Sequence, residues 1–463
     1  MLRIYNSLSN KKEIFKPIHG NQVRLYVCGM TVYDFCHIGH ARSMIVFDVI
    51  VRYFKLLGYD VLFVRNITDI DDKIIKRAIE NQESTISLTE RFIDALHEDT
   101  AALGLLSPDE EPKATNYIDN MISLITILLD KNFAYIAEGG DVYFDVRRFK
   151  EYGKLSHRNL EKLKAGVRIE VTDVKRYPLD FILWKMAKSG EPKWPSPWGE
   201  GRPGWHIECS AMSTHLLGQP FDIHGGGVDL KFPHHENEIA QSEAACQQSF
   251  ANIWMHVGLL QVNNEKMSKS LGNYYTIRDV KETYHSETIR YFMLSSHYRS
   301  PVNYSVENLN QSFQALSRLY LCLLEDLSLK LDLSSHLIKP FLEKFFEAMN
   351  DDFNTPEALA VLFEISHEIN RLSSQGMMED ARLLSNLLKY FGNVLGILQS
   401  DPKVFLQGKF SSTDNAKIEQ LIMTRTQARK ERNWQLADEV RVELQTMGIT
   451  IEDSAEGTRW RRS

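Results

Sequence analysis

The chain has 463 residues, of which 43% are hydrophobic and 25% charged, and its formal net charge is −7. These values are typical of a globular protein of about three domains. The acidic balance argues against a protein that coats nucleic acid, although a local basic surface still allows an RNA partner. The longest apolar stretch, residues 121–129, is far shorter than the roughly 18 residues of a membrane span. Because the N-terminus also has no basic region followed by an apolar core, we expect a cytoplasmic protein that does not bind membranes.

The first part of the chain alternates strand and helix patterns. Residues 23–27 form a short apolar run, apolar positions recur at helical spacing over residues 41–57, and residues 60–67 form a second apolar run. A strand, a helix and a strand of these lengths predict a parallel sheet. Ligands of such sheets bind beyond the carboxyl ends of the strands, which is where Cys28 and Thr68 fall.

The middle of the chain predicts an insertion followed by a second strand–helix portion. Residues 105–203 contain amphipathic helix patterns and a segment rich in Pro, Trp and Gly at 192–203. Beyond them, residues 221–224 predict a strand, the three glycines 225–227 a turn, and a helix begins near His234.

The last third of the chain predicts mainly helices. Residues 305–398 have an almost wholly helical pattern, which is typical of a bundle. A single charged helix is expected over 412–447, with Gly448 as its cap and a strand-like piece at 449–452. The fold class predicted is therefore α/β, with a doubly wound, Rossmann-type parallel sheet and an insertion, followed by a helical bundle and a small C-terminal domain.

Two motifs suit the binding of a triphosphate. His37-Ile38-Gly39-His40 opens the first predicted helix, whose N-terminus offers unpaired N–H groups and a partial positive charge. Its two imidazoles are able to donate to phosphate oxygens, and Gly39 leaves room for adenine. Lys266-Met267-Ser268-Lys269-Ser270 brings two ammonium groups and two hydroxyls to a short loop, which suits a leaving pyrophosphate. The first motif alone is compatible with an ordinary helix start, and the second alone with a solvated basic loop.

Four residues have the character of metal ligands. His234 and Glu238 lie four apart on a predicted helix and so project from one face, while Cys28 and Cys209 supply thiols. This set suits zinc. Spacing alone does not bring Cys28 to Cys209. A buried cysteine is usually just a small hydrophobic residue, and a helical His/Glu pair usually belongs to a solvated face. The five cysteines are odd in number and widely spread, which predicts reduced thiols rather than a disulfide framework.

The two phosphate motifs together resemble the signatures of class I aminoacyl-tRNA synthetases, and the whole chain resembles the cysteinyl-tRNA synthetases. The segments that match are 28–34 (CGMTVYD), 66–73 (NITDIDDK), 204–210 (GWHIECS), 224–230 (HGGGVDL) and 232–238 (FPHHENE). This resemblance implies ATP-dependent activation of L-cysteine and its transfer to tRNA(Cys), with ATP bound together with Mg²⁺. It also implies one Zn²⁺ per subunit and a monomer.

The resemblance assigns roles to individual residues. His37, His40, Lys266 and Lys269 are the expected catalytic residues. The expected ATP contacts are His37, Gly39, His40, Gly226, Asp229, Lys266, Ser268 and Lys269; the expected cysteine contacts are Gly29, Thr31, Thr68, Trp205 and His234; the expected zinc ligands are Cys28, Cys209, His234 and Glu238. Four neighbouring histidines, at positions 206, 224, 235 and 256, form either a second layer around these ligands or ordinary core histidines.

The resemblance also implies a division into domains. The expected catalytic domain is 1–310, in which 105–203 is the insertion and 260–310 holds the KMSKS loop and a region that contacts the tRNA stem. A tRNA-binding helical bundle is expected at 311–400 and an anticodon-recognition domain at 401–463. The last of these combines Arg with Trp at 428–434 and 458–462, and such planes stack on unpaired bases. By itself this tail is also compatible with a solvated charged end.

Three other functions compete with this interpretation. A zinc-dependent ligase that joins activated cysteine to a small amine would share the ATP and zinc sites, but it would not need the helical bundle and the basic, aromatic tail. An RNA-binding module with a structural zinc would not require both phosphate motifs. A nucleotidyltransferase of the same superfamily would not require a cysteine pocket.

Overall fold

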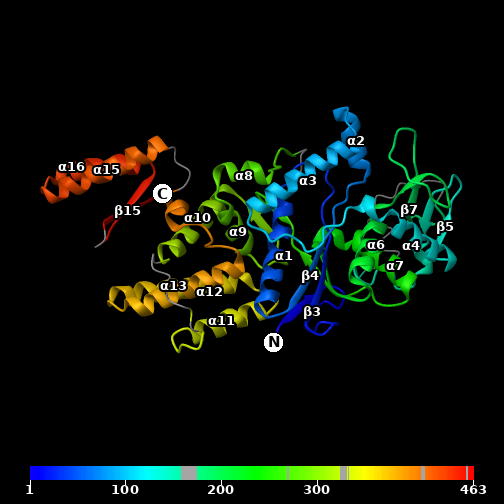
Figure 1. Ribbon diagram of the computed structural model, residues 1–463, viewed down its shortest axis with the longest axis horizontal. Helices are drawn as coiled ribbons and strands as arrows, with labels where there is room; N and C mark the ends of the chain where they lie inside the picture. Colours follow the sequence, from blue (N-terminus) through cyan, green and yellow to red (C-terminus); the bar gives the residue numbers. More distant parts are fainter. Residues whose placement is uncertain are drawn as a thin grey trace. The chain divides into compact units, whose positions relative to one another are not determined.

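A four-stranded parallel sheet organises the first part of the fold, where Figure 1 labels its strands β3 and β4. The computed structural model describes residues 1–157, 175–267, 271–323, 331, 333–407, 412–454 and 457–462. In it the strands lie in the order β10–β9–β3–β4. Their bounds are β3 (Gln22–Val27), β4 (Asp60–Arg65), β9 (Phe221–Gly227) and β10 (Ala251–Val257). All three neighbouring pairs are parallel, so the parallel sheet expected from the sequence is confirmed.

The order of the strands determines where a ligand can bind. Strand β3 pairs on one side with β4, its successor in the sequence, and on the other side with β9, which follows the insertion. The sheet therefore changes winding direction between β3 and β9. A crevice opens at such a point, outside the carboxyl ends of the strands. Here β3 is followed by Cys28, and β9 ends at Gly227.

Helices pack against the sheet through the alternating side chains of its strands. Helix α1 (Ile38–Leu56) contacts β4, β9 and β10, and helix α6 (Trp205–Leu217) contacts β3 and the neighbouring helix α7 (His234–Cys246). Tyr26 of β3 and Val64 of β4 belong to the apolar core that includes α6 and α7. Side chains of one strand point alternately to opposite faces. The same short strand can therefore pack against helices on both faces of the sheet.

The turn expected at Gly225–Gly227 is wrong, because these glycines continue strand β9. Gly225 pairs with Met255 of β10 and with Val27 of β3. A Cβ atom at Gly225 would lie 2.2 Å from the ring of Phe47 on α1. Glycine is needed here because the helix approaches the strand closely, which is a role of strand glycines that a local turn signal does not distinguish.

The segment between α3 and β9 contains strands besides the helices expected from its amphipathic patterns. Besides α4 (Ile118–Asp130), it contains an antiparallel sheet in the order β5–β6–β7–β8. Its strands are β5 (Ala134–Ile136), β6 (Val142–Phe144), β7 (Phe181–Met186) and β8 (Gly201–Pro203). The aromatic side chains of these strands, including Phe144 and Phe181 with ring centroids 5.0 Å apart, give the sheet its own packed face.

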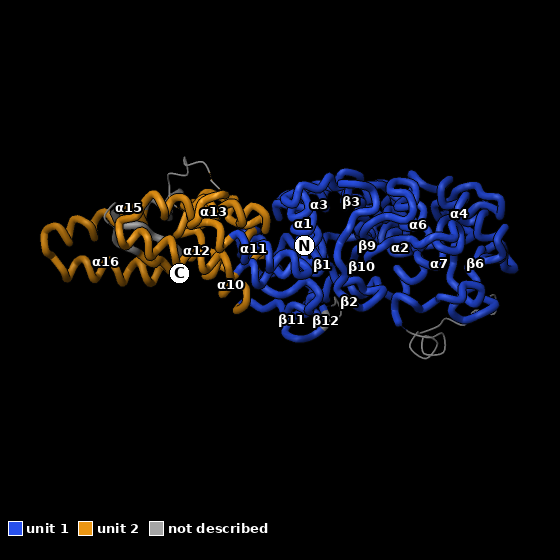
Figure 2. The backbone as a smooth tube through the Cα atoms, turned by 90° about the horizontal axis from the view of Figure 1, so that it is seen from below, with its two compact units in different colours: residues 1–286, 292–306, 342–359 blue, residues 287–291, 307–341, 360–463 orange. Residues whose placement is uncertain are grey.

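The remaining elements are short or helical. One small sheet pairs β1 (Arg3–Asn6) with β2 (Lys11–Ile14). Another has the order β12–β11–β13, with β11 (Leu260–Val262), β12 (Glu265–Lys266) and β13 (Val302–Tyr304). The other helices up to the bundle are α2 (Asp72–Asn81), α3 (Thr85–Ala102), α8 (Ile277–Thr283) and α9 (Ser286–Leu294). The described chain divides into two compact units, residues 1–286, 292–306 and 342–359, and residues 287–291, 307–341 and 360–463 (Figure 2).

Helices dominate the second half of the chain, as the sequence predicts. They are α10 (Val306–Leu321), α11 (Lys339–Asn350), α12 (Thr355–Ser374), α13 (Met378–Leu395) and α14 (Pro402–Gln407). Within the second unit, the carboxylate of Glu287 accepts hydrogen bonds from the backbone N–H groups of Leu398, Gln399 and Ser400 at 2.6, 3.1 and 2.9 Å. It also accepts the hydroxyl of Tyr320 at 2.7 Å. This buried carboxylate thus fixes the turn that follows α13.

The single C-terminal helix expected over 412–447 is wrong. The chain forms α15 (Ser412–Lys430), a turn, and α16 (Trp434–Thr446), followed by the hairpin β14 (Ile449–Ser454) and β15 (Gly457–Arg462). Asn433 caps α16, because its side chain accepts the N–H of Leu436. The two helices lie side by side and share a small apolar cluster with β14.

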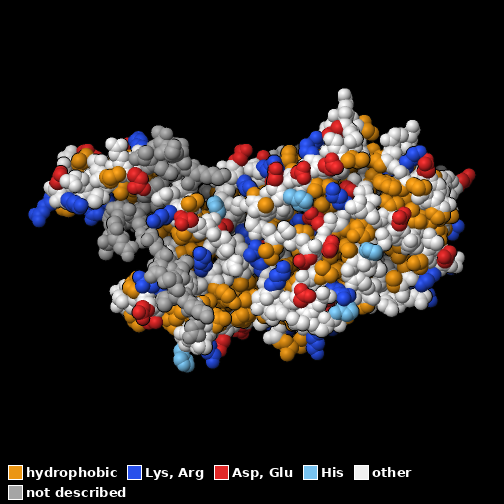
Figure 3. Space-filling view, in the orientation of Figure 1, with side chains coloured by type: hydrophobic (Ala, Val, Ile, Leu, Met, Phe, Trp, Pro, Cys, Tyr) orange, Lys and Arg blue, Asp and Glu red, His pale blue; other side chains and the backbone are white. Residues whose placement is uncertain are grey.

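The surface of the chain mixes charges of both signs. On the face shown in Figure 3, basic and acidic side chains of the first unit are interspersed rather than separated. In the part of the chain that the structure describes, every helix is too short or too polar to cross a membrane.

Replacing Glu287 by glutamine should destabilise the second unit by about 2–3 kcal/mol, because an amide N–H₂ would face groups that all donate. Chemical denaturation, followed by circular dichroism, would measure this as a lower midpoint of the transition of this unit. The matched control is Glu379→Gln, since Glu379 is exposed on the first turn of α13. Equal midpoints for the two variants would contradict the role of Glu287.

Candidate active site

The four residues with metal-ligand character converge in the structure. Cys28 Sγ lies 3.8 Å from Cys209 Sγ and 3.6 Å from Glu238 Oε1, and His234 Nε2 lies 3.1 Å from the same carboxylate oxygen. The four donor atoms all lie within 4.8 Å of one another. Two thiols, an imidazole and a carboxylate at these separations form a donor set suited to zinc.

Three separate segments of the fold position the four candidate ligands. Cys28 directly follows β3, and its N–H donates to the carbonyl of Gly225 on β9 at 3.0 Å. Cys209 lies in the second turn of α6, and His234 and Glu238 lie one turn apart on α7. The packing of α6 on α7 closes the cluster, and the side chains of Cys209, His234 and Glu238 are almost completely buried.

Burial favours the neutral forms of Cys28, His234 and Glu238 by shifting their pKa values. It raises the pKa of the Cys28 thiol, which the hydrogen-bonded thiol of Cys209 raises further. Burial likewise raises the pKa of the Glu238 carboxyl and lowers the pKa of His234. A bound divalent cation reverses this preference for the thiol and the carboxyl, because the charge of the ion compensates for lost hydration. The chemistry of the donor set therefore fits a metal ion.

Two of the neighbouring histidines, His206 and His224, form polar contacts with these candidate ligands. His206 Nδ1 lies 2.8 Å from His234 Nδ1, so Nε2 is the nitrogen of His234 that faces Glu238. His224 Nε2 lies 2.8 Å from Glu238 Oε2, and its ring stacks on Trp254 with centroids 4.4 Å apart. Partners of this kind fix the orientation of a metal ligand.

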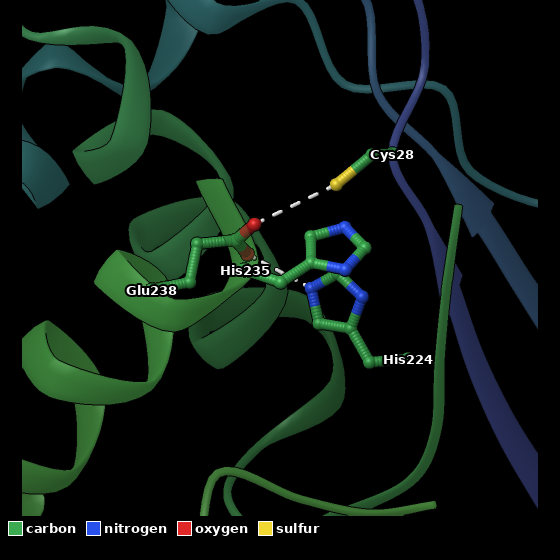
Figure 4. Close-up of side chains that lie close together, drawn as sticks. All are labelled: Cys28, His224, His235 and Glu238. Carbon is green, nitrogen blue, oxygen red and sulfur yellow. Dashed lines mark hydrogen bonds and ion pairs between the residues drawn. The ribbon is translucent and has the colours of Figure 1, made fainter. Parts of the chain in front are cut away.

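The histidines also create a second, overlapping group of donors. Cys28, His224, His235 and Glu238 again have donor atoms within 4.8 Å of one another, and Figure 4 shows the Glu238 carboxylate linked to both Cys28 and His224. His235 Nδ1 lies 2.9 Å from His256 Nε2, and His256 Nδ1 lies 2.8 Å from Ser7 Oγ. Both groups share Cys28 and Glu238, so they cannot each hold an ion at the same time. A zinc ion would favour the group with two thiols, because sulfur ligands favour zinc.

A cavity of about 540 Å³ adjoins this cluster. Its lining includes many residues singled out from the sequence, namely Cys28, Gly29, Thr31, His37, Gly39, His40, Trp205 and Asp229. Thr68 and His234 are buried instead, although the ring of His234 lies 4.2 Å from that of Trp205 in the wall. Gly227, rather than Gly226, lines the cavity, because Gly226 faces His235 and Leu230.

The two histidines at the start of α1 are locked together. His37 is the N-cap, and its Nδ1 accepts the N–H of His40 at 3.2 Å, while His40 Nδ1 accepts the N–H of His37 at 3.3 Å. The rings stack with centroids 3.5 Å apart. Burial lowers the pKa of His40, so this ring is neutral. A neutral imidazole whose Nδ1 accepts has its proton on Nε2, where it can serve as a hydrogen-bond donor.

The second phosphate motif is only partly described. Ser268 and Lys269 lie outside the described residues, as does the side chain of Lys266, whose backbone belongs to β12. Met267 reaches α1, because its Cε would lie 3.4 Å from a Cβ atom at Gly39. The segment that follows the motif is also tied to the first one, since the N–H of Ile38 donates to the carbonyl of Tyr275 at 3.1 Å.

Sequence reasoning missed a buried polar chain at the end of β4. Asn66 Oδ1 accepts the N–H of Gly29 at 2.8 Å, and a Cβ atom at Gly29 would lie only 1.6 Å from the carbonyl oxygen of Asn66. Asn66 Nδ2 donates to Thr68 Oγ1 at 3.3 Å, which in turn donates to Glu208 at 3.1 Å. Thr68 was predicted from its place at a strand end, whereas the only signal for Asn66 and Glu208 was their place within the matching segments.

Comparison with known proteins supports the resemblance to the aminoacyl-tRNA synthetases that the sequence motifs indicate. Residues 14–314 match the family described as tRNA synthetases class I (C) catalytic domain, residues 344–399 match the DALR domain, and residues 415–461 match the cysteinyl-tRNA ligase anticodon binding domain. A cysteine–tRNA ligase of Coxiella burnetii (strain Dugway 5J108-111) is 58% identical over 462 residues, which cover 100% of both chains. The chain belongs to the cysteine–tRNA ligase family.

Other relatives agree with this membership. A cysteine–tRNA ligase of Legionella pneumophila (strain Corby) is 57% identical over 100% of this chain and 99% of its own length. A solved structure of Mycobacterium tuberculosis methionyl-tRNA synthetase with methionyl-adenylate has a TM-score of 0.60, with 83% of this chain and 91% of that chain covered. At 16% identity, this last likeness concerns the fold alone. It supports the class I synthetase fold expected from the two phosphate motifs.

Replacing Cys209 by serine should weaken zinc binding at least about tenfold, because a hydroxyl replaces a thiolate ligand. Metal content after dialysis, measured by mass spectrometry, tests this expectation. Cys246→Ser is the matched control, since Cys246 is exposed and lies outside the cluster. If both variants kept one zinc ion per chain with unchanged affinity, the assignment of Cys209 as a ligand would be wrong.

Proposed function

We propose that this member of the family activates L-cysteine with ATP and transfers it to tRNA(Cys), giving Cys-tRNA(Cys), AMP and pyrophosphate. The observation that supports this best is the thiol-rich donor set at the edge of a cavity that also contains the first phosphate motif. A sulfur-binding cluster and a phosphate-binding helix N-terminus in one crevice suit a substrate that carries a thiol and reacts with ATP.

In the activation step, the carboxylate of cysteine attacks the α-phosphate of ATP, which is bound with Mg²⁺. No general base is required, so the chain contributes alignment and charge stabilisation. The Nε2–H groups of His37 and His40 would donate to phosphate oxygens. Lys266, Ser268 and Lys269 would stabilise the leaving pyrophosphate, with Lys269 acting most directly.

The rest of the site would hold the two substrates in register. Gly39 and Asp229 would lie along the nucleotide, and we now assign to Gly227 the close approach that was expected of Gly226, because Gly227 lines the cavity. Gly29, Thr31, Thr68, His234 and Trp205 would surround the cysteine substrate.

Discrimination against serine is the chemical purpose of the metal. Cysteine and serine differ by one atom, and pocket shape alone separates such pairs poorly. Zinc held by Cys28, Cys209, His234 and Glu238, one ion per subunit, would favour the substrate thiolate over a hydroxyl. Four protein ligands are typical of a closed site, so the substrate sulfur would have to add to an expanded coordination shell.

The C-terminal part would recognise tRNA. We propose the division into a catalytic domain at 1–310, with an insertion at 105–203, a bundle at 311–400 and an anticodon domain at 401–463. Trp434 is 60% exposed at the first position of α16, where its ring is available for stacking on a base. The side chains of 458–462 lie outside the described residues. We further propose that the enzyme acts as a monomer in the cytoplasm.

Aminoacylation of total tRNA with labelled cysteine tests the whole proposal. We expect charging of the cysteine-accepting tRNA alone, with no charging by serine in excess and with strong loss of activity after removal of zinc by a chelator. Formation of cysteinyl-adenylate without charging of any tRNA would instead indicate a ligase that uses a small amine. The absence of cysteine-dependent exchange of pyrophosphate into ATP would overturn both.

A truncated chain that ends at Gln407 should activate cysteine normally but charge tRNA at least about 100-fold more slowly, because it lacks the groups that would stack on bases. The cut retains Phe405 and so preserves its ring stacking on Tyr320, with centroids 4.1 Å apart. Pyrophosphate exchange and aminoacylation, measured on one preparation, separate the two effects. Equal losses in both assays would show that the last residues support the fold rather than tRNA binding.

A further inference from the structure

Glu208 is a buried carboxylate that the proposed function has not yet used. It lies in the first turn of α6 and is 1% exposed. Among the described residues its hydrogen-bond partner is the hydroxyl of Thr68, with Thr68 Oγ1 3.1 Å from Glu208 Oε2, and no lysine, arginine or histidine pairs with it. Burying a carboxylate without a cation is costly, so this arrangement suits a ligand that brings a positive charge.

The hydrogen bonds give Thr68 a definite polarity. A hydroxyl has one proton, and Thr68 donates it to Glu208. Asn66 Nδ2, at 3.3 Å, donates to the same oxygen. What Thr68 can still offer is therefore a lone pair, so its next partner must be a donor.

This acceptor lies beside the substrate cavity. The N–H of Thr68 donates to the carbonyl of Met30, and Met30 lines the cavity. On α6, Glu208 lies three positions after Trp205, which also lines the cavity, so both residues are on the same helical face.

The same polar chain reaches the sulfur-binding cluster. Asn66 Oδ1 lies 3.8 Å from Cys209 Sγ, so the acceptor on Thr68 is two hydrogen-bonded links from a proposed metal ligand. In cysteine, the amino nitrogen is three covalent bonds from the sulfur. A substrate whose sulfur is bound at the cluster would thus bring its ammonium group close to Thr68.

We propose that Glu208 is a positioning residue for the α-ammonium group of the substrate. It orients the Thr68 hydroxyl as an acceptor for that group and places behind it a carboxylate that the bound ammonium would keep ionised. A charge-assisted hydrogen bond of this kind is stronger than a neutral one. The consequence is a specificity for thiols that carry a neighbouring amine. This inference rests on the proposed function, because it assumes that the substrate sulfur is bound at the cluster.

Three ligands separate recognition of the amine from binding of the sulfur. Cysteine contains thiol, amine and carboxylate, cysteamine lacks the carboxylate, and 3-mercaptopropionate lacks the amine. Isothermal titration calorimetry with the full-length zinc enzyme, in the absence of ATP, would measure the affinity for each. In Glu208→Gln the amide oxygen can still accept from Thr68, so this variant removes the charge while keeping the shape.

We expect Glu208→Gln to bind cysteine and cysteamine roughly 10- to 100-fold more weakly, as expected for loss of a nearby charge at low polarity. Binding of 3-mercaptopropionate should change less than about twofold, and zinc content should stay at one ion per chain. Thr68→Val should show the same selective loss, and Thr68→Ser, which restores a hydroxyl, should bind all three ligands nearly as the unmodified enzyme does.

Two results would overturn the inference. Equal weakening for all three ligands would show that Glu208 only supports the fold, and unchanged affinities would show that its charge does not reach the amine. The Thr68 pair decides the matter if Glu208→Gln does not fold. Failure of the proposed function itself would look different, because the unmodified enzyme would then bind cysteine no better than serine.

Discussion

The site depends on holding four reactive side chains together, three of them almost completely buried and Cys28 at the edge of the cavity. Two thiols, an imidazole and a carboxylate, contributed by three separate segments, are held within 4.8 Å of one another. Burial raises the pKa of Cys28 and Glu238 and lowers that of His234, so the protein by itself disfavours charge there. Such a cluster is stable either as neutral groups or around a cation. Burying these groups lowers the stability of the metal-free protein, and the same burial would raise its affinity for a metal ion.

The parallel sheet makes this concentration possible. Its winding direction changes between β3 and β9, so the ends of two strands meet at one crevice. Contact there is so close that side chains are excluded at Gly29, beside Asn66, and at Gly225, beside Phe47. The helices α6 and α7 then supply the three almost completely buried members of the cluster. The geometry of the site therefore depends directly on the fold, because the backbone contacts that pair the strands also set the positions of the ligands.

Local patterns in the sequence were sufficient for part of this arrangement. Periodicity predicted the first strand–helix–strand unit, and hence that Cys28 and Thr68 end neighbouring strands. The glycine signal failed at Gly225–Gly227, where a packed helix rather than a turn requires glycine, and periodicity failed at Asn433, whose cap divides the predicted C-terminal helix. The approach of Cys28 to Cys209 spans 181 residues, so only the resemblance to a family linked them. Glu208 was missed because a charged residue at a helix start is usually solvated.

The proposed chemistry distributes recognition of one small substrate over three places in the fold. Sulfur is distinguished at the end of β3, the amine at the end of β4, and phosphate at the N-terminus of α1. Asn66 joins the first two, since it accepts the N–H of Gly29 and donates to Thr68. A displacement of the substrate sulfur would therefore also shift the Thr68 hydroxyl that accepts from the amine. Because the carboxylate is attached to the same carbon as the amine, fixing sulfur and nitrogen together also aims the nucleophile, and selection of the amino acid and alignment for reaction become the same event.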